Sequence, residues 1–522
     1  MLAWAIILVL LVDALVAIRH GLSSGEKPDR PQASGQSGTT PGAYTPGSSP
    51  SSLPSYLATA TPVKGELSPS ARRTLERAKP GTYIPGVGTA PWGVNGNTID
   101  VVYYWKGDRT MSSEYLGPTG QRGAVDEADA ARNFVAYINK HAAGGATLMG
   151  FPFNLHGRRL RLTVYDAGQY PETYGSTAET IKEKPPFVAI SSHGGLSDYI
   201  CDYLYKKKIF NISTYDLGRY RGGLFEGTNG YCLPAGMTWE NQVELSVSYL
   251  AKHARSTKYR GSQKRVYGIL YADYPGLKES VARLKTKLEA AGLTIPVVYQ
   301  LPTSLTDSAA GPATSAVGRM RSKGVNTIIA PDGGGPITFT HAAQARGYTP
   351  DYFVWPCSGQ DAAGQVRLYD PAQWANAEGL SCYDEHWGLD LTLDGNARNS
   401  QWYRQYQEVA GRKDPPSLSP LVYQALLPML AGITNAGRDL TVERFRAGMM
   451  AFKYPRGLVR YDAIKGPTAD QSFFWVALGD RDGGQIGDCA KVTWSSTKRT
   501  PGNSTAGAYV YSGTRYRPGY RF

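Results

Sequence analysis

The sequence predicts an α/β protein with two lobes, each built on a doubly wound parallel sheet, and a cleft between the lobes. Two successive series of apolar strands and amphipathic helices support this prediction. In the first series, the strand Ile99 to Trp105 precedes a helix from about Arg122 to Lys140, and further strands are expected at 160–165, 187–192 and 209–213. The second series begins with the strand Val266 to Tyr271.

One unit of the second series has the pattern of a ligand-binding turn. In "GVNTIIAPDGGGPITFTHAAQARGYTP", a buried strand (325–330) stops before Asp332, three glycines follow, and Pro336 opens a helix that ends before Gly347. This order puts a carboxylate and bare backbone N–H groups at the carboxyl end of a strand. Ligands of open α/β sheets bind at that edge.

Composition excludes several classes of protein. The chain has 522 residues, 41% of them hydrophobic, and a mean hydropathy of -0.34, which excludes a polytopic membrane protein. The net charge of +13 is spread among 43 acidic residues, with no basic run longer than Lys206 to Lys208. We therefore expect no nucleic-acid partner.

The first residues predict export. Met1 to Ile18 is apolar apart from Asp13, which is typical of a signal or membrane-anchor segment, assigned to 1–20. Arg19 follows the apolar run and no positive charge precedes it, which a start codon placed too far downstream would explain. Residues 21–95 are rich in Ser, Gly, Pro and Thr and predict a disordered tether with a reach of roughly 45 Å. The predicted location is extracytoplasmic, at the cell surface or tethered to the membrane.

Five cysteines lack the spacing of a metal site. No CxxC or Cys/His pattern occurs, so we expect neither zinc nor another metal. An exported chain favours two disulfides and one remaining thiol. The predicted pairs are Cys201 with Cys232 and Cys357 with Cys382, with Cys489 left over, and buried free thiols are the alternative.

Four stretches carry a resemblance to a known family. They are "GAVDEADAARNFVAYIN", "VYGILYADYPGLKESVARLKTKLEAAG", "GVNTIIAPDGGGPITFTHAAQARGYTPDYFVW" and "LVYQALLPMLAGITNAGRDLTVERFRAGM". With them, residues 99–475 resemble the type I periplasmic-binding-protein family, in particular the branched-chain amino-acid type of solute-binding protein that serves ABC transporters. The resemblance implies binding of a small molecule between the lobes, without chemistry and without a cofactor, and we expect a monomer.

The resemblance also implies lobe boundaries. The chain would cross between lobes near Leu233, Tyr352 and Phe452. The first lobe would then comprise 96–235 and 353–450, and the second 236–352 and 451–490. An irregular C-terminal tail would occupy 491–522.

Seven residues are candidate ligand contacts, five of them by the same resemblance. Ser191, Ser192 and Thr214 of the first lobe would hold a carboxylate, whereas Tyr274 and Asp332 of the second would hold an ammonium. Aromatic side chains at the strand ends depart from the family pattern and leave a larger or aromatic ligand open. These aromatic side chains are Trp105, Trp355, Tyr103, Tyr215 and Tyr271, and His193 is a further bulky residue in this region. Trp105 and Trp355 complete the set of seven candidates.

Each candidate also has a purely structural interpretation. Asp332 is a common type of turn or N-cap residue, and the two serines could cap a helix near Leu196. Tyr274 could pack on the lobe surface and Trp355 in its core. No G-x-S-x-G motif accompanies the histidine, and the triple glycine lacks a following Lys-Ser/Thr, so neither catalysis nor nucleotide binding is expected.

The leading functional hypothesis is therefore a non-enzymatic, extracytoplasmic solute-binding protein. It would capture a small polar metabolite, such as an amino acid or a related compound, and deliver it to an ABC transporter permease. The alternative is a ligand-sensing or partner-binding module at the cell surface on the same fold, without transport.

Overall fold

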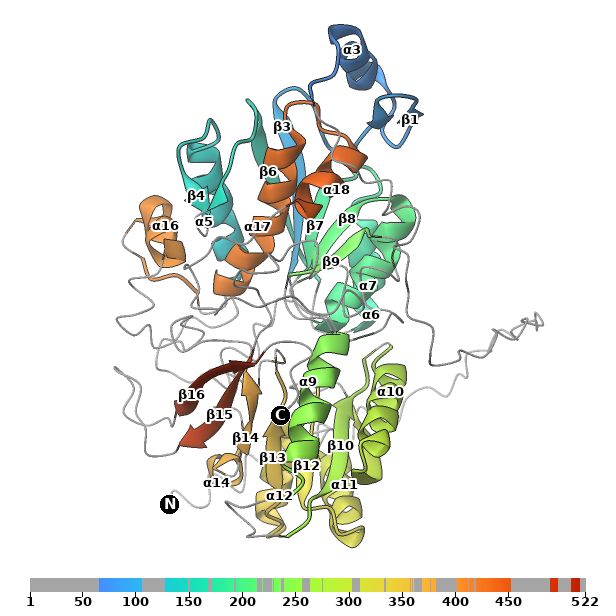
Figure 1. Ribbon diagram of the computed structural model, residues 1–522, viewed down its shortest axis with the longest axis vertical. Helices are drawn as coiled ribbons and strands as arrows, with labels where there is room; N and C mark the ends of the chain where they lie inside the picture. Colours follow the sequence, from blue (N-terminus) through green and yellow to red (C-terminus); the bar gives the residue numbers. More distant parts are fainter. Residues whose placement is uncertain are drawn as a thin grey trace, which may run out of the picture. The chain divides into compact units, whose positions relative to one another are not determined.

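The computed structural model shows two sheets covered by helices, with further short elements near the N-terminus (Figure 1). It describes residues 65–105, 127–148, 151–167, 171–191, 194–213, 218, 228, 230–235, 239–255, 263–274, 276–302, 310–332, 335–356, 358, 360, 369–375, 377–381, 401–411, 413–416, 419–451, 489–495 and 508–516. The apolar segment 1–20 and residues 21–64 of the predicted tether lie outside these ranges.

The first sheet has five parallel strands in the order β6-β3-β7-β8-β9. They are β3 (Thr98–Trp105), β6 (Arg159–Asp166), β7 (Val188–Ser191), β8 (Phe210–Ser213) and β9 (Cys232–Pro234). The strand order reverses direction at β3, because β6 pairs on one side of it and β7 on the other. This is the order of a doubly wound sheet, as predicted. A separate antiparallel pair joins β4 (Thr147–Leu148) to β5 (Phe151–Pro152).

The side chains of β3 show why helices cover both faces of this sheet. Ile99, Val101 and Tyr103 pack in one core cluster with side chains of α5 (Glu127–Lys140), α16 (Gln401–Ala410), α17 (Ser419–Ala436) and α18 (Val442–Met450). Val102 and Tyr104 pack in another, with α6 (Pro171–Glu179) and α7 (Gly194–Leu204). Successive strand residues point to opposite faces, so a strand that is apolar throughout must be covered on both.

The second sheet has seven strands in the order β11-β10-β12-β13-β14-β15-β16. They are β10 (Val266–Ala272), β11 (Thr294–Leu301), β12 (Thr327–Ile329), β13 (Asp351–Val354), β14 (Ala377–Ser381), β15 (Cys489–Ser495) and β16 (Ala508–Tyr516). The first five strands pair in parallel, whereas β15 and β16 are antiparallel. Two parallel-sheet lobes are thus present, and the predicted fold class is confirmed.

Helices also cover both faces of the second sheet. Side chains of α9 (Trp239–Lys252) and α10 (Leu277–Ala290) share a core cluster with Tyr267, Ile269 and Tyr271 of β10. Those of α11 (Ala310–Ser322), α12 (Pro336–Ala345) and α14 (Pro371–Trp374) share one with Leu270 on the opposite face. α12 begins at Pro336, as predicted, because proline needs no N–H partner in the first turn.

The second crossing between lobes differs from the prediction. Residues 353–381 were assigned to the first lobe, yet β13 and β14 pair beside β12 in the second sheet. The later helices α16, α17 and α18 do pack against the first sheet. The chain therefore changes lobe after Ser381 and not near Tyr352, because strand pairing holds β14 in the second sheet.

The predicted irregular tail also differs from the structure. β15 and β16 extend the second sheet, and β15 pairs with β14 from Glu378 to Ser381. Tyr, Val and Thr in these strands suit a sheet despite the lack of a clear alternation. β15 pairs with β14, which lies more than a hundred residues earlier, so no local pattern predicts that this pair joins the second sheet.

The predicted disorder of 21–95 is wrong for its last part. Residues 65–95 contain the helix α3 (Pro69–Arg77) and an antiparallel pair of β1 (Tyr83–Ile84) with β2 (Gly88–Thr89). The Oγ of Ser68 caps α3 by accepting the N–H of Ala71 at 3.2 Å. A short helix at Arg72 to Lys79 is compatible with the sequence, and α3 overlaps it, but composition did not indicate the β1–β2 pair or the contacts of this segment with residues more than 350 positions later.

One predicted disulfide is confirmed. Cys201 of α7 bonds to Cys232 of β9, with the two Cα atoms 6.0 Å apart. The short 3-10 helix η2 (Tyr205–Lys207) lies between these elements in the chain. Cys357 and Cys382 lie outside the described residues, so their pairing stays a prediction, and Cys489 begins β15.

Candidate functional site

The carboxyl edge of the first sheet brings several polar residues into register. Trp105, the last residue of β3, pairs with Asp166 of β6, and its neighbour Tyr104 pairs with Ser191 of β7. Ser191 in turn pairs with Ser213 of β8. All these strands are parallel, so the carboxyl ends of β3, β6, β7 and β8 meet at one edge of the sheet, where ligands of such sheets bind.

Ser191 has a structural contact at this edge. Its side chain is buried, and its Oγ lies 3.0 Å from Oδ1 of Asn211, an acceptor on the neighbouring strand β8. The helix α7 then begins at Gly194, so the turn from β7 directs the N-terminus of a helix toward the same edge. A helix N-terminus favours an anion. Ser192, His193, Thr214 and Tyr215 lie outside the described residues.

Trp105 lies mostly in the core. Only 7% of its surface is exposed, and it belongs to the cluster formed with α5. Tyr103, two residues earlier on the same face, donates its hydroxyl to Oε2 of Glu127 at 2.9 Å. Contact of Trp105 with a ligand stays a prediction.

In the second lobe, Asp332 links two strand ends. Its Oδ1 accepts the N–H of Gly335 at 3.1 Å, and its Oδ2 accepts the N–H of Ala272, the last residue of β10. The first contact stabilises the turn that leads into α12, which is the structural role weighed for Asp332 in the sequence. The second places the carboxylate beside the end of β10.

The segment after β10 lies next to this carboxylate. Tyr274 is half-buried and packs against the α9–α10 core cluster, and its N–H donates to the carbonyl of Ala272 at 2.9 Å. Asp332 and Tyr274 thus both contact Ala272 at the end of β10. Whether either residue contacts a ligand stays a prediction.

Trp355 packs in the core of the second lobe, which is the structural interpretation that the sequence left open. Its side chain is fully buried, its Nε1–H donates to Oε1 of Gln242 at 2.9 Å, and its ring lies 5.5 Å from that of Trp239. The indole is thus packed between β13 and α9 with its only donor satisfied. This placement favours a packing role over ligand contact.

Sequence reasoning missed further polar groups at these edges. Asp166 and Ser213 end strands of the first sheet, and a clear signal for Asp166 was its place directly after the apolar strand "RLRLTVY". On the second lobe, Asp273 and Glu279 are exposed near the end of β10. Burial raises the pKa of Tyr271, and the charges of Asp273 and Glu279 raise it further. Asp273 and Glu279 therefore place negative charge near the end of β10.

The described part of the chain contains no group of three or more metal-ligating side chains. Within the same residues, no helix is both long enough and apolar enough to cross a membrane.

Two parallel-sheet α/β lobes, each with polar groups at its carboxyl edge, are typical of two-lobed binding proteins. The family follows from the sequence match: the model of the periplasmic binding protein family matches residues 115–476. The chain belongs to this family, and the predicted resemblance is confirmed.

Solved structures share the fold at low sequence identity. A fatty acid ABC transporter substrate-binding protein from Thermomonospora curvata is 14% identical, with a TM-score of 0.53 over 84% of this chain and 97% of that one. A periplasmic binding protein from Burkholderia mallei is 13% identical, with a TM-score of 0.54 over 82% and 97%. A branched chain amino acid ABC transporter periplasmic ligand-binding protein from Burkholderia xenovorans LB400 is 14% identical, with a TM-score of 0.50 over 80% and 96%. A search of curated proteins finds no match to the sequence.

Proposed function

We propose that the protein is an extracytoplasmic, membrane-tethered solute-binding protein that captures a small polar metabolite between its lobes, as a monomer, and delivers it to an ABC permease. Membership of the periplasmic binding protein family supports the binding role. Proteins of similar fold include ABC transporter binding proteins whose names specify a fatty acid and branched-chain amino acids. Their ligands differ, so the class of ligand has to be inferred from this chain's own residues.

The observation that carries the ligand class is the position of Asp332. Its carboxylate lies beside the end of β10, at an edge that also bears the exposed Asp273 and Glu279. Negative groups at this edge suit a ligand with an ammonium or another cationic group. On the first lobe, the start of α7 and the nearby Ser192 and Thr214 would suit a carboxylate. An amino acid or a related zwitterion carries both groups.

Binding would proceed without chemistry. Closing the lobes removes water from the ligand, which strengthens the contact between its ammonium and Asp332. A ligand that binds the closed form more tightly shifts the population toward it, and the permease would recognise that form.

The test begins with a thermal-shift panel of amino acids, amides, polyamines, aromatic acids and sugars on the chain without its first 20 residues. A ligand at 100 times its Kd adds about 2.7 kcal/mol of stability, which such a panel detects. Calorimetric titration of the best ligand then compares wild type with Asp332→Asn. Asparagine keeps one oxygen acceptor, which can serve the N–H of Gly335, but it removes the charge and replaces the oxygen that accepts the N–H of Ala272 with an amide donor. The unfolding temperature of the ligand-free variant therefore has to be measured alongside the titration.

We expect Asp332→Asn to weaken an ammonium-bearing ligand by at least tenfold, since hydrogen bonds to charged groups contribute about 1.5–3 kcal/mol. Asp273→Asn, which removes an equal charge from an exposed position on the same edge, should change the Kd by less than about threefold. Equal affinity of Asp332→Asn and wild type would refute the site. If no compound stabilises a folded wild type, the partner-binding alternative gains support over transport.

A further inference from the structure

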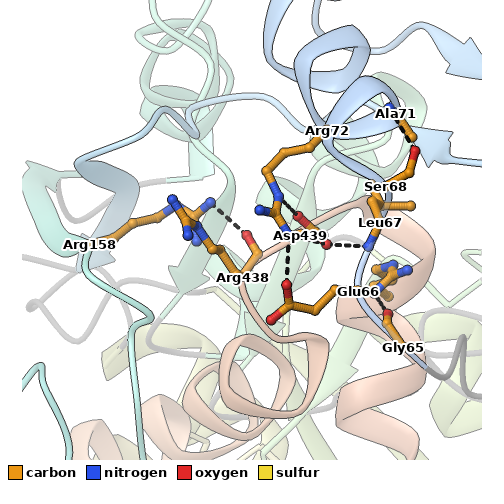
Figure 2. Close-up of polar contacts among 10 residues, drawn as sticks. Gly65, Glu66, Leu67, Ser68, Ala71, Arg72, Arg158, Arg438 and Asp439 are labelled. Carbon is orange, nitrogen blue, oxygen red and sulfur yellow. Dashed lines mark hydrogen bonds and ion pairs between the residues drawn. The ribbon is translucent and has the colours of Figure 1, made fainter.

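Residues 65–93, here called the N-terminal strap, dock on the first lobe through charged groups far away in sequence. Figure 2 shows the centre of this contact, the carboxylate of Asp439 in the turn between α17 and α18. Arg72 donates its Nε–H to Oδ1 of Asp439 at 2.5 Å and an Nη2–H to Oδ2 at 3.2 Å, and the N–H of Leu67 reaches Oδ2 at 2.6 Å. Side-chain exposure is 1% for Asp439 and 20% for Arg72, so this ion pair is largely shielded from water.

The Asp439 carboxylate is held in its charged form. Burial alone would raise the pKa of Asp439, but the hydrogen bonds from Arg72 and the Leu67 N–H together outweigh burial and lower it. Breaking such a buried pair leaves a charge without compensation. The contact is therefore strong where the carboxylate is ionised.

Two charged residues of α18 also form hydrogen bonds with the strap. Glu443 accepts the N–H of Thr89 at 2.7 Å and its Oγ1–H at 2.6 Å. Arg444 donates an Nη1–H to the carbonyl of Gly65 at 2.8 Å. Gly88 lies so close that a Cβ on it would be 2.6 Å from Oε2 of Glu443, and its φ of +119° disfavours other residues.

The strap lies at the amino edge of the first sheet. Arg158, the residue before β6, donates to the carbonyl of Arg438 at 2.8 Å, and the carbonyl of Gly93 accepts the N–H of Asp100 near the start of β3 at 2.7 Å. β3 runs about 25 Å from this edge to Trp105 at the carboxyl edge. The strap therefore sits opposite the candidate ligand site of its own lobe.

Polar contacts hold the strap from Gly65 to Thr89, whereas its end packs against the apolar core: Ala90 is buried, and Trp92 packs against the cluster formed with α6 and α7. α3 contains no buried residue, and the contacts of Arg72, Leu67, Thr89 and Gly65 described above join the strap to the first lobe. An element held in this way can detach when its polar contacts are lost, while the core beneath it stays folded.

We propose that the N-terminal strap docks reversibly on the first lobe. The predicted tether would then attach the protein through its first lobe, and the N-terminal chain would not restrain the second lobe. Docking shortens the predicted tether by roughly thirty residues and gives it a defined exit point on the amino edge. The second lobe can then move on ligand binding without strain on the attachment. The role in lobe movement rests on the proposed function, whereas the docking itself does not.

Hydrogen exchange of the full chain, followed by mass spectrometry without any ligand, tests this proposal. The variants are Arg72→Ala and Asp439→Asn, with Arg73→Ala as the matched control, because Arg73 is the exposed neighbour of Arg72 on the same helix. We expect the strap amides, including those of Leu67 and Thr89, to exchange at least tenfold faster in the first two variants and at the wild-type rate in the control. Amides of β3, β7, β10 and β12 should keep wild-type protection in all three.

Three outcomes would overturn the proposal. Wild-type protection of the strap in Arg72→Ala would mean that the ion pair does not hold it. Loss of protection in β3 and β7 would make the strap an integral part of the lobe, and faster exchange in β10 or β12 would mean that it also restrains the second lobe. Because no ligand is used, failure here is distinguishable from failure of the proposed function.

Discussion

Replacing Arg265 should destabilise the second lobe by several kcal/mol. Arg265 precedes β10 and is 2% exposed, and its Nη2 contacts Oε1 of Glu378 on β14 and lies 3.9 Å from Oδ2 of Asp351 at the start of β13. Two opposite charges 4 Å apart attract by about 4 kcal/mol at an effective dielectric constant of 20. Removing one partner of a buried pair costs about 3–5 kcal/mol, because the remaining charges stay desolvated.

The variant Arg265→Met keeps much of the side-chain volume and leaves both carboxylates without their cation. Two-lobed proteins need not unfold in one step, so native-state hydrogen exchange at the amides of β10 and β13 is the suitable assay. We expect their opening free energy to fall by about 3–5 kcal/mol.

The matched control is Lys285→Met, which removes a cation from an i,i+4 pair with Glu289 on the surface of α10. Such a pair contributes about 0.3–0.5 kcal/mol. The reasoning is refuted if Arg265→Met costs less than about 1 kcal/mol, the upper range for an exposed pair.

Two further predictions concern the first lobe and the second sheet's helices. The folded-state pKa of Asp439 is lowered, so its pair with Arg72 contributes fully above the unfolded value of about 3.9 and is lost as pH falls through the folded value. The difference in Tm between wild type and Arg72→Ala should therefore be constant from pH 5 to 8 and shrink as the pH falls below the unfolded value, and a difference that stays unchanged in acid would contradict the ionic origin. A Cβ on Gly448 of α18 would lie 2.6 Å from the carbonyl oxygen of Gly432 on α17, so Gly448→Ala should lower stability by about 1–3 kcal/mol. Gly318→Ala, in α11 with nothing within 4 Å, should raise it by about 0.5–1 kcal/mol, and urea unfolding that gave both variants the same sign would contradict this account.

Much of the fold could be predicted from local sequence. The apolar run from Ile99 to Trp105 predicted the strand β3, and the glycine turn before Pro336 predicted the start of α12. Both predictions were possible because a buried strand and a helix start depend on residues that are close in sequence. The pair Cys201–Cys232 was also correct. The lobe assignment of 353–381 failed because a strand's sheet depends on its pairing partner, which no local pattern specifies.

The candidate site was predictable in position but not in detail. Parallel strands bring their carboxyl ends together, and Ser191 and Asp332 lie at such ends of the two sheets. The burial of Trp355 against Trp239 could not be foreseen, since strand and helix meet only in the folded core. Ligand contact by these residues remains a prediction.

By itself the sequence determined the two βα series, their helix starts and the family, since each depends on residue order and periodicity over short distances. Only the tertiary structure decided which strands extend the second sheet and which residues order the N-terminal strap. β15 reaches a partner more than a hundred residues earlier, and Arg72 meets Asp439 across 367 positions. Such contacts depend on three-dimensional proximity and on removal of charges from water, which composition does not reveal.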